Sequence, residues 1–334
     1  MAKKVSLLIG GWSAERDVSL TKGRAVEAAL REGGYDVIVI DVKKDLPALI
    51  AALTPKPDVA FCNLYGRGGE DGTIQGVLEM LGIPYTHSGI LASAVAMDKP
   101  MTKTMAASVG VPSAEGIVAT KAQVLAGHVM APPYVVKPTN EGSSVGVRII
   151  LENDNQAPLD AESWTYGDCV LVERYIPGRE LTVAVLDGVP QAVTEIKAQT
   201  RFFDYEAKYS DNRTTYHLPA EVPEDVYKCA MDYAARVYNV LGCEGLARCD
   251  FRYDDSKPGT TGIFLLEINT QPGLTAESIG PSQVVRNGKS FVELCSHLVE
   301  TARCHDQNVM AENAPAHSGA SSSQGATDKQ KLSA

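Results

Sequence analysis

Carboxylate and amide side chains gather at the end of one expected β-strand and in the strand before it. Side chains alternate along a strand, so Glu267 and Asn269 share a face with Leu265. Asp250 lies in the preceding expected strand, and it converges with Glu267 and Asn269 if the two strands pair. Oxygen donors without His or Cys suit Mg²⁺ or Mn²⁺, with substrate phosphates completing the coordination shell. Spacing alone divides evenly between such a metal site and a solvated sheet end that carries surface acids.

A second candidate is the loop at 141–146, which reads Glu-Gly-Ser-Ser-Val-Gly and follows an expected strand that carries Lys137. Small residues let backbone N–H groups approach phosphate oxygens, and the lysine adds positive charge. The loop lacks the Gly-Lys-Ser/Thr sequence that opens a helix in a Walker A motif. The pattern favours phosphate binding over its alternative, a plain hairpin turn.

Three further segments are rich in glycine or in charge. Residues 10–15 join an expected strand to a helix without the spacing of a dinucleotide-binding loop, and Glu15 at the helix start suits an ammonium group. Residues 66–72 hold four glycines among charged residues, and the alternative interpretation is a flexible turn. Residues 204–209 are charged, aromatic and without periodicity, which is typical of an exposed loop or of a lid that closes on substrate.

The elements that must position these residues follow two patterns. In the first hundred residues, short apolar runs alternate with helical periodicity, which predicts a parallel sheet. From residue 134 to about 196, short β-rich runs joined by glycine turns predict a small antiparallel lobe, with a hairpin at 186–189. The expected strands are 5–9, 37–40, 59–62, 246–253 and 261–268, and the expected helices are 20–31, 73–81, 224–240 and 291–302.

Composition excludes several classes of function. The net charge is −10 and there is no block of Lys or Arg, which argues against nucleic-acid binding. No segment approaches the roughly 20 apolar residues of a membrane span, and the first apolar run is too short for a signal peptide. We therefore expect a cytoplasmic protein without a membrane partner. The seven cysteines form no Cys-x-x-Cys pair and are expected to be free thiols. The polar segment 305–334 predicts a disordered tail.

Taken together, the motifs resemble those of the D-alanine–D-alanine ligases, a family of the ATP-grasp superfamily. The resemblance runs from about residue 5 to about residue 301, in the family's order and with similar spacing. The motifs that carry it are Gly10 to Ser19, Gly66 to Gly72, Met97 to Lys99, Val136 to Pro138 with Glu141 to Gly146, Asp204 to Tyr209, and Leu266 to Thr275.

This resemblance implies an α/β fold with three lobes that grip ATP. The expected divisions are an N-terminal parallel-sheet lobe at 1–98, a small central lobe at 99–187, a C-terminal lobe at 188–304 and the tail at 305–334. ATP is expected between the central and C-terminal lobes. Relatives of this kind further imply a homodimer.

The resemblance also assigns roles around ATP, residue by residue. Lys99 and Lys137 would contact the phosphates under the loop that contains Ser143 and Ser144, while Lys208 would reach the γ-phosphate. The adenine hinge would run from Glu173 to Ile176, and Glu180 would hold the ribose. Two Mg²⁺ or Mn²⁺ ions would be bound by Asp250, Glu267 and Asn269.

The implied reaction joins two D-alanine molecules through an acyl phosphate. Glu15 would hold the ammonium group of the first D-alanine, within a hydrogen-bond network of Glu15, Ser143 and Tyr209. Arg248 and the Gly273 N–H would stabilise the tetrahedral oxyanion when the second amine attacks. Ser278 and Ile279 would contact the second substrate.

The sequence departs from the family pattern at one substrate contact, where Leu-His-Gly is replaced by Leu64-Tyr65-Gly66. A related ligase with D-lactate or D-serine as second substrate is therefore an alternative. A catalytically silent nucleotide-binding protein is a third hypothesis, against which the complete set of oxygen donors argues. We expect the ligase.

Overall fold

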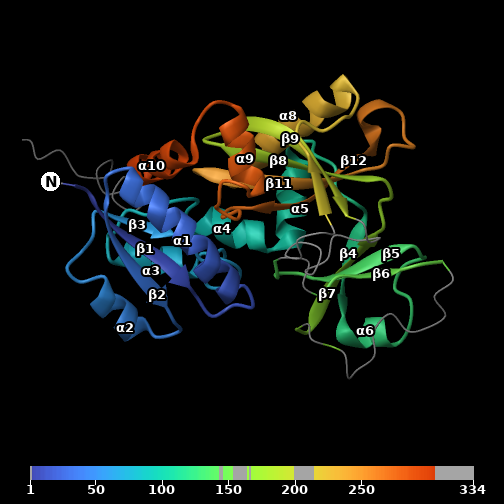
Figure 1. Ribbon diagram of the computed structural model, residues 1–334. Helices are drawn as coiled ribbons and strands as arrows, with labels where there is room; N and C mark the ends of the chain where they lie inside the picture. The colour runs from blue at the N-terminus through green and yellow to red at the C-terminus, as the bar shows by residue number, and fades with distance from the viewer. Residues whose placement is uncertain (1, 143–145, 153–163, 165–166, 199–213, 305–334) are drawn as a thin grey trace, which may run out of the picture.

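The computed structural model describes residues 2–142, 146–152, 164, 167–198 and 214–304. Within these ranges the strands form three sheets, which have three, four and five strands (Figure 1). Helices pack on the three-stranded and five-stranded sheets, so the chain has the mixed α/β architecture expected from its sequence.

The N-terminal lobe is built on a parallel sheet in the order β2-β1-β3, as predicted. The strands β1 and β3 are covered on both faces, and Leu7, Leu8 and Phe61 are completely buried, whereas the edge strand β2 exposes Ile38 and Val39. The elements of this lobe are β1 (Lys4–Gly10), α1 (Arg16–Glu32), β2 (Asp36–Val42), α2 (Leu46–Ala52), β3 (Val59–Cys62) and α3 (Thr73–Met80).

The central lobe is an antiparallel sheet in the order β4-β7-β5-β6. Tyr134, Val136 and Val172 pack with Val124 of the short helix α6 into a small core of their own. The elements are β4 (Gly116–Thr120), α6 (Lys121–Leu125), β5 (Tyr134–Pro138), β6 (Arg148–Ile150) and β7 (Cys169–Arg174).

The C-terminal lobe contains the antiparallel order β10-β9-β8-β11-β12. The expected hairpin at 186–189 joins β8 to β9, and its turn residues Asp187 and Gly188 both have positive φ, as a type I′ turn requires. The strands are β8 (Arg179–Leu186), β9 (Val189–Ala198), β10 (Thr214–His217), β11 (Leu246–Tyr253) and β12 (Ile263–Asn269). The helices are α4 (Ile90–Met97), α5 (Lys99–Ser108), α8 (Glu224–Leu241), the 3-10 turn η1 (Gly259–Gly262), α9 (Ile279–Arg286) and α10 (Phe291–Thr301).

The strand pairing divides the chain differently from the expected lobe limits. The limit at 187 falls in the hairpin between β8 and β9, two paired strands of one sheet, whereas the four-stranded sheet ends at Arg174. Helices α4 and α5, on either side of the limit at 98, both place alanines in the core of the C-terminal lobe. We therefore propose that the central lobe begins after α5 and ends near 175–178.

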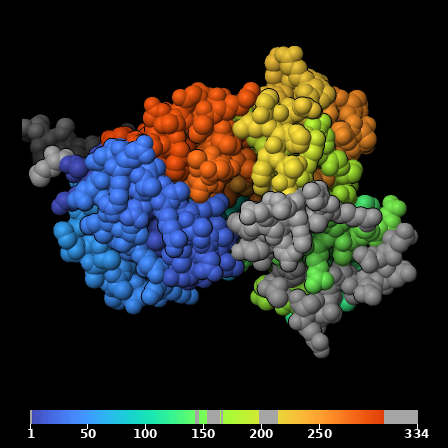
Figure 2. Space-filling view, viewed as in Figure 1, coloured from blue at the N-terminus to red at the C-terminus, as the bar shows by residue number. Residues whose placement is uncertain are grey.

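The N-terminal and C-terminal lobes share a core. Val26 and Leu30 of α1 belong to the same buried cluster as Leu294 and Leu298 of α10 and Leu246 of β11. In Figure 2 the N-terminal lobe (blue) lies at the lower left and the central lobe (green) at the lower right, with the C-terminal lobe (yellow to red) above them. No helix among the described residues is long and apolar enough to cross a membrane.

Candidate active site

The strand pair β11–β12 brings the expected oxygen donors together. The antiparallel register sets Asp250 opposite Glu267 and Arg248 opposite Asn269, so the pairing assumed from the sequence is confirmed. A register shift follows directly after Asp250. Such an irregularity bends a strand and redirects its side chains.

Each carboxylate of this pair is held by a cation. Asp250 accepts hydrogen bonds from Arg248 Nε at 2.9 Å and Nη2 at 2.7 Å, and from Thr182 Oγ1 at 2.5 Å. Glu267 Oε2 lies 3.3 Å from Lys99 Nζ. Asn269 Oδ1 accepts from the Gln271 N–H at 2.8 Å. Two carboxylates, each beside a cation, and an amide oxygen fit a hard divalent metal ion, whose remaining ligands a substrate would supply.

Lys99 connects two lobes at this point. It is the first residue of α5, where Asp98 caps the helix by accepting the Met101 N–H. Its ammonium also donates to the Glu141 carbonyl at 2.6 Å, at the start of the small-residue loop of the central lobe. A small cavity of about 30 Å³ lies between this loop and the strand end, lined among others by Glu141, Glu267 and Asn269.

The second expected phosphate ligand is paired within the central lobe. Lys137 Nζ lies 2.5 Å from Glu173 Oε1, and Lys103 Nζ lies 2.9 Å from the other oxygen of Glu173. Burial acts to raise the pKa of Glu173, but the two lysines outweigh it and the pKa is lowered. Lys103 follows Lys99 by one helical turn, a spacing from which the sequence could have identified it.

The expected adenine hinge and ribose contact lie where the central lobe meets β8. Ile176 is buried, and its carbonyl accepts from Arg252 Nε at 3.1 Å. Glu180 lies 3.7 Å from Arg252 Nη1 and stands opposite it in the β8–β11 pair. Glu173 thus lies at the end of β7 and Glu180 at the start of β8, with Ile176 in the connection between these strands.

Two buried carboxylates of the N-terminal lobe face the same region. Glu15 occupies the N-cap position of α1, as expected, and Glu70 comes from the loop 66–72. A Cβ atom added at Gly142 would lie 3.6 Å from Glu15 Oε1 and 3.9 Å from Glu70 Oε2, so the central-lobe loop reaches both acids. Burial, followed by repulsion from Glu15, raises the pKa of Glu70 well above its usual range.

Gly273 and Ser278 lie together beyond the end of β12. Ser278 Oγ is 2.8 Å from Thr275 Oγ1, and a Cβ atom added at Gly273 would lie 3.5 Å from Ser278 Oγ. Tyr65, the departure from the family pattern, is buried here. Its hydroxyl donates to Asn63 Oδ1 at 2.8 Å and accepts from the Leu274 N–H at 3.2 Å. Tyr65 therefore anchors the chain segment that carries Gly273.

The glycine loop 66–72 is tied to the C-terminal lobe as well as to its own. Gln271 Nε2 donates to the Gly69 carbonyl at 2.5 Å. Gly68 has a φ of +88°, and an added Cβ atom would lie 2.2 Å from the Trp12 ring, so only glycine fits. A wide groove of about 980 Å³ runs from Trp12 and Gly68 to Thr139 and Cys169 of the central lobe.

Four expected site residues, Ser143, Ser144, Lys208 and Tyr209, lie outside the described residues, as does the expected tail. Three further residues of the region were missed: Glu70, Lys103 and Lys22. Glu70 stood in a motif singled out for its glycines, and Lys22 lies seven residues after Glu15 on α1, hence on the same helix face.

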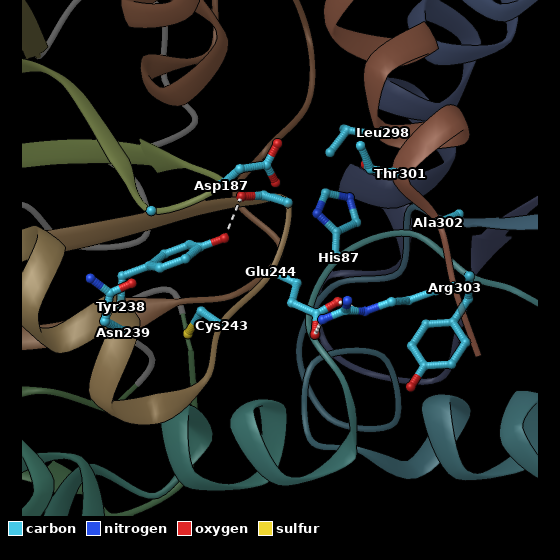
Figure 3. A pocket seen from close by; sticks show the side chains of 13 residues that line it. His87, Asp187, Tyr238, Asn239, Cys243, Glu244, Leu298, Thr301, Ala302 and Arg303 are labelled. Atoms are coloured by element: carbon cyan, nitrogen blue, oxygen red, sulfur yellow. Dashed lines mark hydrogen bonds and ion pairs between the residues drawn. The ribbon is translucent and has the colours of Figure 1, made fainter. Parts of the chain in front are cut away.

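A second cavity, of about 330 Å³, lies away from these residues, where α10 meets the N-terminal and C-terminal lobes. Figure 3 shows the His87 ring standing between Asp187 and Arg303. Burial lowers the pKa of His87 to about 4, with a hydrogen bond to the Leu246 backbone acting in the opposite direction. Within the described ranges its Nδ1 atom has no hydrogen-bond partner.

Known proteins resemble this chain over nearly its whole described length. A family model, described as D-ala D-ala ligase C-terminus, matches residues 108–300. The D-alanine–D-alanine ligase of Granulibacter bethesdensis is 50% identical over 302 residues, covering 90% of this chain and 98% of the relative. That of Acidiphilium cryptum is also 50% identical over 302 residues, covering 90% and 99%.

A solved structure agrees with this relationship. The D-alanine–D-alanine ligase from Bacillus anthracis complexed with ATP matches with a TM-score of 0.75 and 30% identity, covering 94% of this chain and all of the other. The resemblance seen in the sequence motifs is confirmed. The chain belongs to the D-alanine–D-alanine ligase family and has the ATP-grasp fold.

Proposed function

We propose that the protein ligates two D-alanine molecules to D-alanyl-D-alanine at the expense of ATP, releasing ADP and phosphate for the synthesis of peptidoglycan precursors. The observation that carries this proposal is the strand pair in which Asp250 stands opposite Glu267 and Arg248 opposite Asn269, beside Lys99. Family membership supplies the substrates that these groups would serve.

ATP would lie between the central and C-terminal lobes. Lys99 and Lys137 would bind its phosphates, each leaving a present partner, Glu141 or Glu173, to do so. The hinge from Glu173 to Ile176, whose two end residues are buried, would hold the adenine and Glu180 the ribose. Ser144 and Lys208 would complete the phosphate site.

Asp250, Glu267 and Asn269 would hold two Mg²⁺ or Mn²⁺ ions, for which their oxygen donors are suited. Such ions, when bound, neutralise charge on the transferring phosphoryl group. In this protein the flanking cations Arg248 and Lys99 show that the same acidic strand end attracts positive charge.

In the first half-reaction a D-alanine carboxylate oxygen attacks the γ-phosphorus, the bond to the bridging oxygen of ADP breaks, and an acyl phosphate forms. Glu15 would hold the ammonium group of this D-alanine, with Ser143 and Tyr209 in the same network. The adjoining Glu70 has its pKa raised by burial and then by repulsion from Glu15, and a bound ammonium group would offset that repulsion.

In the second half-reaction the uncharged amine of the other D-alanine attacks the acyl carbon. Negative charge then develops on the carbonyl oxygen, where Arg248 and the Gly273 N–H would stabilise it. The nitrogen loses a proton, the carbon–oxygen bond to phosphate breaks, and the dipeptide and inorganic phosphate are released. Ser278, at the N-cap of α9, would orient the second substrate.

We further propose that the protein works in the cytoplasm, where ATP is available, and that it forms a homodimer. The test of the function is phosphate release from ATP and Mg²⁺ with D-alanine, with dipeptide identified by mass spectrometry. L-alanine and a reaction without amino acid are the controls. The proposal predicts one phosphate per dipeptide with D-alanine alone, and no phosphate release under these conditions would refute it.

A further inference from the structure

One lysine beside the proposed oxyanion site has no role in the reaction described above. Lys22 lies on α1, two helical turns after Glu15, and its side chain is partly buried. A Cβ atom added at Gly273 would lie only 2.1 Å from Lys22 Nζ, so the ammonium group packs directly against the Gly273 Cα. On its other side, Lys22 Nζ lies 5.7 Å from the centre of the Tyr65 ring.

The Lys22 ammonium is not neutralised by a bonded acid. Across the described part of the chain it makes no hydrogen bond and no ion pair, and its contact is with the ring of Tyr65. Burial, together with repulsion from Arg248, lowers its pKa, while Glu15 and Glu70 act in the opposite direction. A cation that is partly withdrawn from water and has another cation nearby is costly unless an anion joins it.

A second hydrogen-bond donor faces the same point. The Cβ position of Gly273 that nearly touches Lys22 Nζ lies 3.5 Å from Ser278 Oγ. Ser278 bonds to Thr275 and does not cap α9 with its side chain. An ammonium group and a hydroxyl group therefore flank the bare Cα of Gly273, from two different lobes.

We propose that Lys22 binds the carboxylate of the second D-alanine and so selects acceptors that carry one. This inference rests on the proposed function, in which Gly273 and Arg248 receive the oxyanion. The acceptor amine has to be uncharged to attack, whereas its carboxylate stays charged throughout. A cation fixed at Gly273 binds that carboxylate and leaves the amine free to face the acyl carbon.

The inference is tested by competition between two acceptors. D-alaninamide has no carboxylate to phosphorylate, so in a mixture with D-alanine, ATP and Mg²⁺ it serves only as acceptor. The ratio of D-alanyl-D-alanine to D-alanyl-D-alaninamide, measured by mass spectrometry, then reports carboxylate recognition independently of total rate. Each variant is compared with the wild type, which cancels the different basicity of the two amines.

Lys22→Met is expected to shift this ratio toward the amide by about 10- to 100-fold, the usual effect of losing a charged hydrogen bond. Lys22→Arg should retain much of the selectivity. Arg24→Met, which removes an exposed cation from the same helix, is the matched control and should leave the ratio unchanged. Gly273→Ala tests the same contact independently, because the added methyl group displaces the Lys22 ammonium. The backbone of Gly273 is not left-handed, so alanine fits its conformation.

The possible outcomes distinguish failure of this inference from failure of the proposed function on which it rests. A wild type that makes neither product refutes the proposed function. A wild type that makes dipeptide while Lys22→Met keeps the wild-type product ratio refutes the inference alone. A Lys22→Met enzyme with unchanged ratio but a lost limb in its pH–rate profile would mean that Lys22 accepts a proton, which also contradicts carboxylate binding.

Discussion

The proposed active site and the surroundings of the His87 cavity differ in how their charged groups are arranged. Around Gly273, charges of like sign lie near one another: Glu15 beside Glu70, and Lys22 beside Arg248. Around His87, the neighbouring acids Glu244 and Asp187 each have a hydrogen-bonding partner. Arg303 pairs with Glu244, and His297 Nε2 lies 2.5 Å from Asp187 Oδ2. The buried ring of His87 itself stays uncharged at neutral pH because its pKa is about 4.

This difference is expected if the first region binds ligands and the second is an interface that stabilises the fold. Groups that repel one another lower the stability of the protein, and a bound substrate of opposite charge offsets that repulsion. The His87 cavity lies instead where α10 closes over the N-terminal and C-terminal lobes, and its polar groups already have partners or are neutral. Substitutions should therefore change activity in the first region and stability in the second.

The largest effect is expected for Glu267→Gln, which keeps the shape of the side chain but removes its charge. We expect phosphate release to fall by at least about 100-fold, because charge on the transferring group is no longer balanced at the strand end. Steady-state kinetics measures the loss. Asp255→Asn removes an exposed acid from the same lobe and should have little effect. Equal activity in both variants would contradict the metal site.

His87→Asn should flatten the acid limb of the stability curve. The unfolded chain takes up a proton near the ordinary histidine pKa of about 6.5, whereas the folded protein resists it until about 4. Stability is therefore complete above 6.5 and is lost as the pH falls through this window, by about 3 kcal/mol in total.

Asn tolerates the left-handed φ of +71° at this position, so the variant should fold. Urea unfolding at pH 4.5 and 7 measures the dependence for wild type and variant. An identical pH dependence in the two proteins would show that His87 is not held neutral, and activity at neutral pH should be preserved.

Glu70→Gln should act in the opposite direction to His87→Asn at neutral and higher pH. The folded protein retains the Glu70 proton to higher pH than the unfolded chain does, so wild-type stability is lost as the pH rises through the raised pKa. Gln has no such loss, and we expect a gain of about 1 kcal/mol at pH 8 together with reduced activity.

Thermal unfolding across pH 5–8, beside an activity assay, tests this prediction. Glu32→Gln, at an exposed position of α1, is the matched control and should change neither quantity. A destabilised Glu70→Gln enzyme would mean that Glu70 is not repelled by its surroundings.

The smallest effect is expected for Arg303→Met. The Glu244–Arg303 pair is largely exposed on the arginine side, with 53% of the Arg303 side chain accessible, so its loss should cost at most about 1 kcal/mol. Turnover should be unchanged. A double-mutant cycle with Glu244→Gln isolates the interaction energy of the pair. A value above about 1 kcal/mol would contradict the weak ion pair that the exposure of Arg303 implies.

Local pattern was enough to predict much of the fold. β3 was placed at its observed limits and β1 to within a residue at each end, because buried parallel strands are short, uninterrupted apolar runs. The pairing of β11 with β12 was assumed from their succession in the sequence, and the observed antiparallel register confirms it. The sequence did not show that β8 belongs to the sheet of the C-terminal lobe, because an alternating strand can pair with a neighbour in either lobe. Its pairing with β11, some 60 residues later in the chain, decides to which sheet it belongs.

The site residues that belong to a motif could be predicted from the sequence. Those whose importance depends on residues far away in the chain could not. Asp250, Glu267 and Asn269 stand in recognisable order, and the observed register joins them. Lys22 has no motif, and on sequence it is one more lysine of an amphipathic helix. Lys22 becomes a candidate because it contacts Gly273, which is 251 positions later in the chain. The shared core of α1 and α10 brings the two residues together.

Lys99 lies between the two lobes that would bind ATP and contacts both of them. Its ammonium contacts both the Glu141 carbonyl of the central lobe and the Glu267 carboxylate of the C-terminal lobe, and so links the two lobes. A phosphate that binds Lys99 would replace these contacts, so nucleotide binding would exchange one set of contacts for another. The loss of the contacts to Glu141 and Glu267 is therefore subtracted from the affinity for ATP.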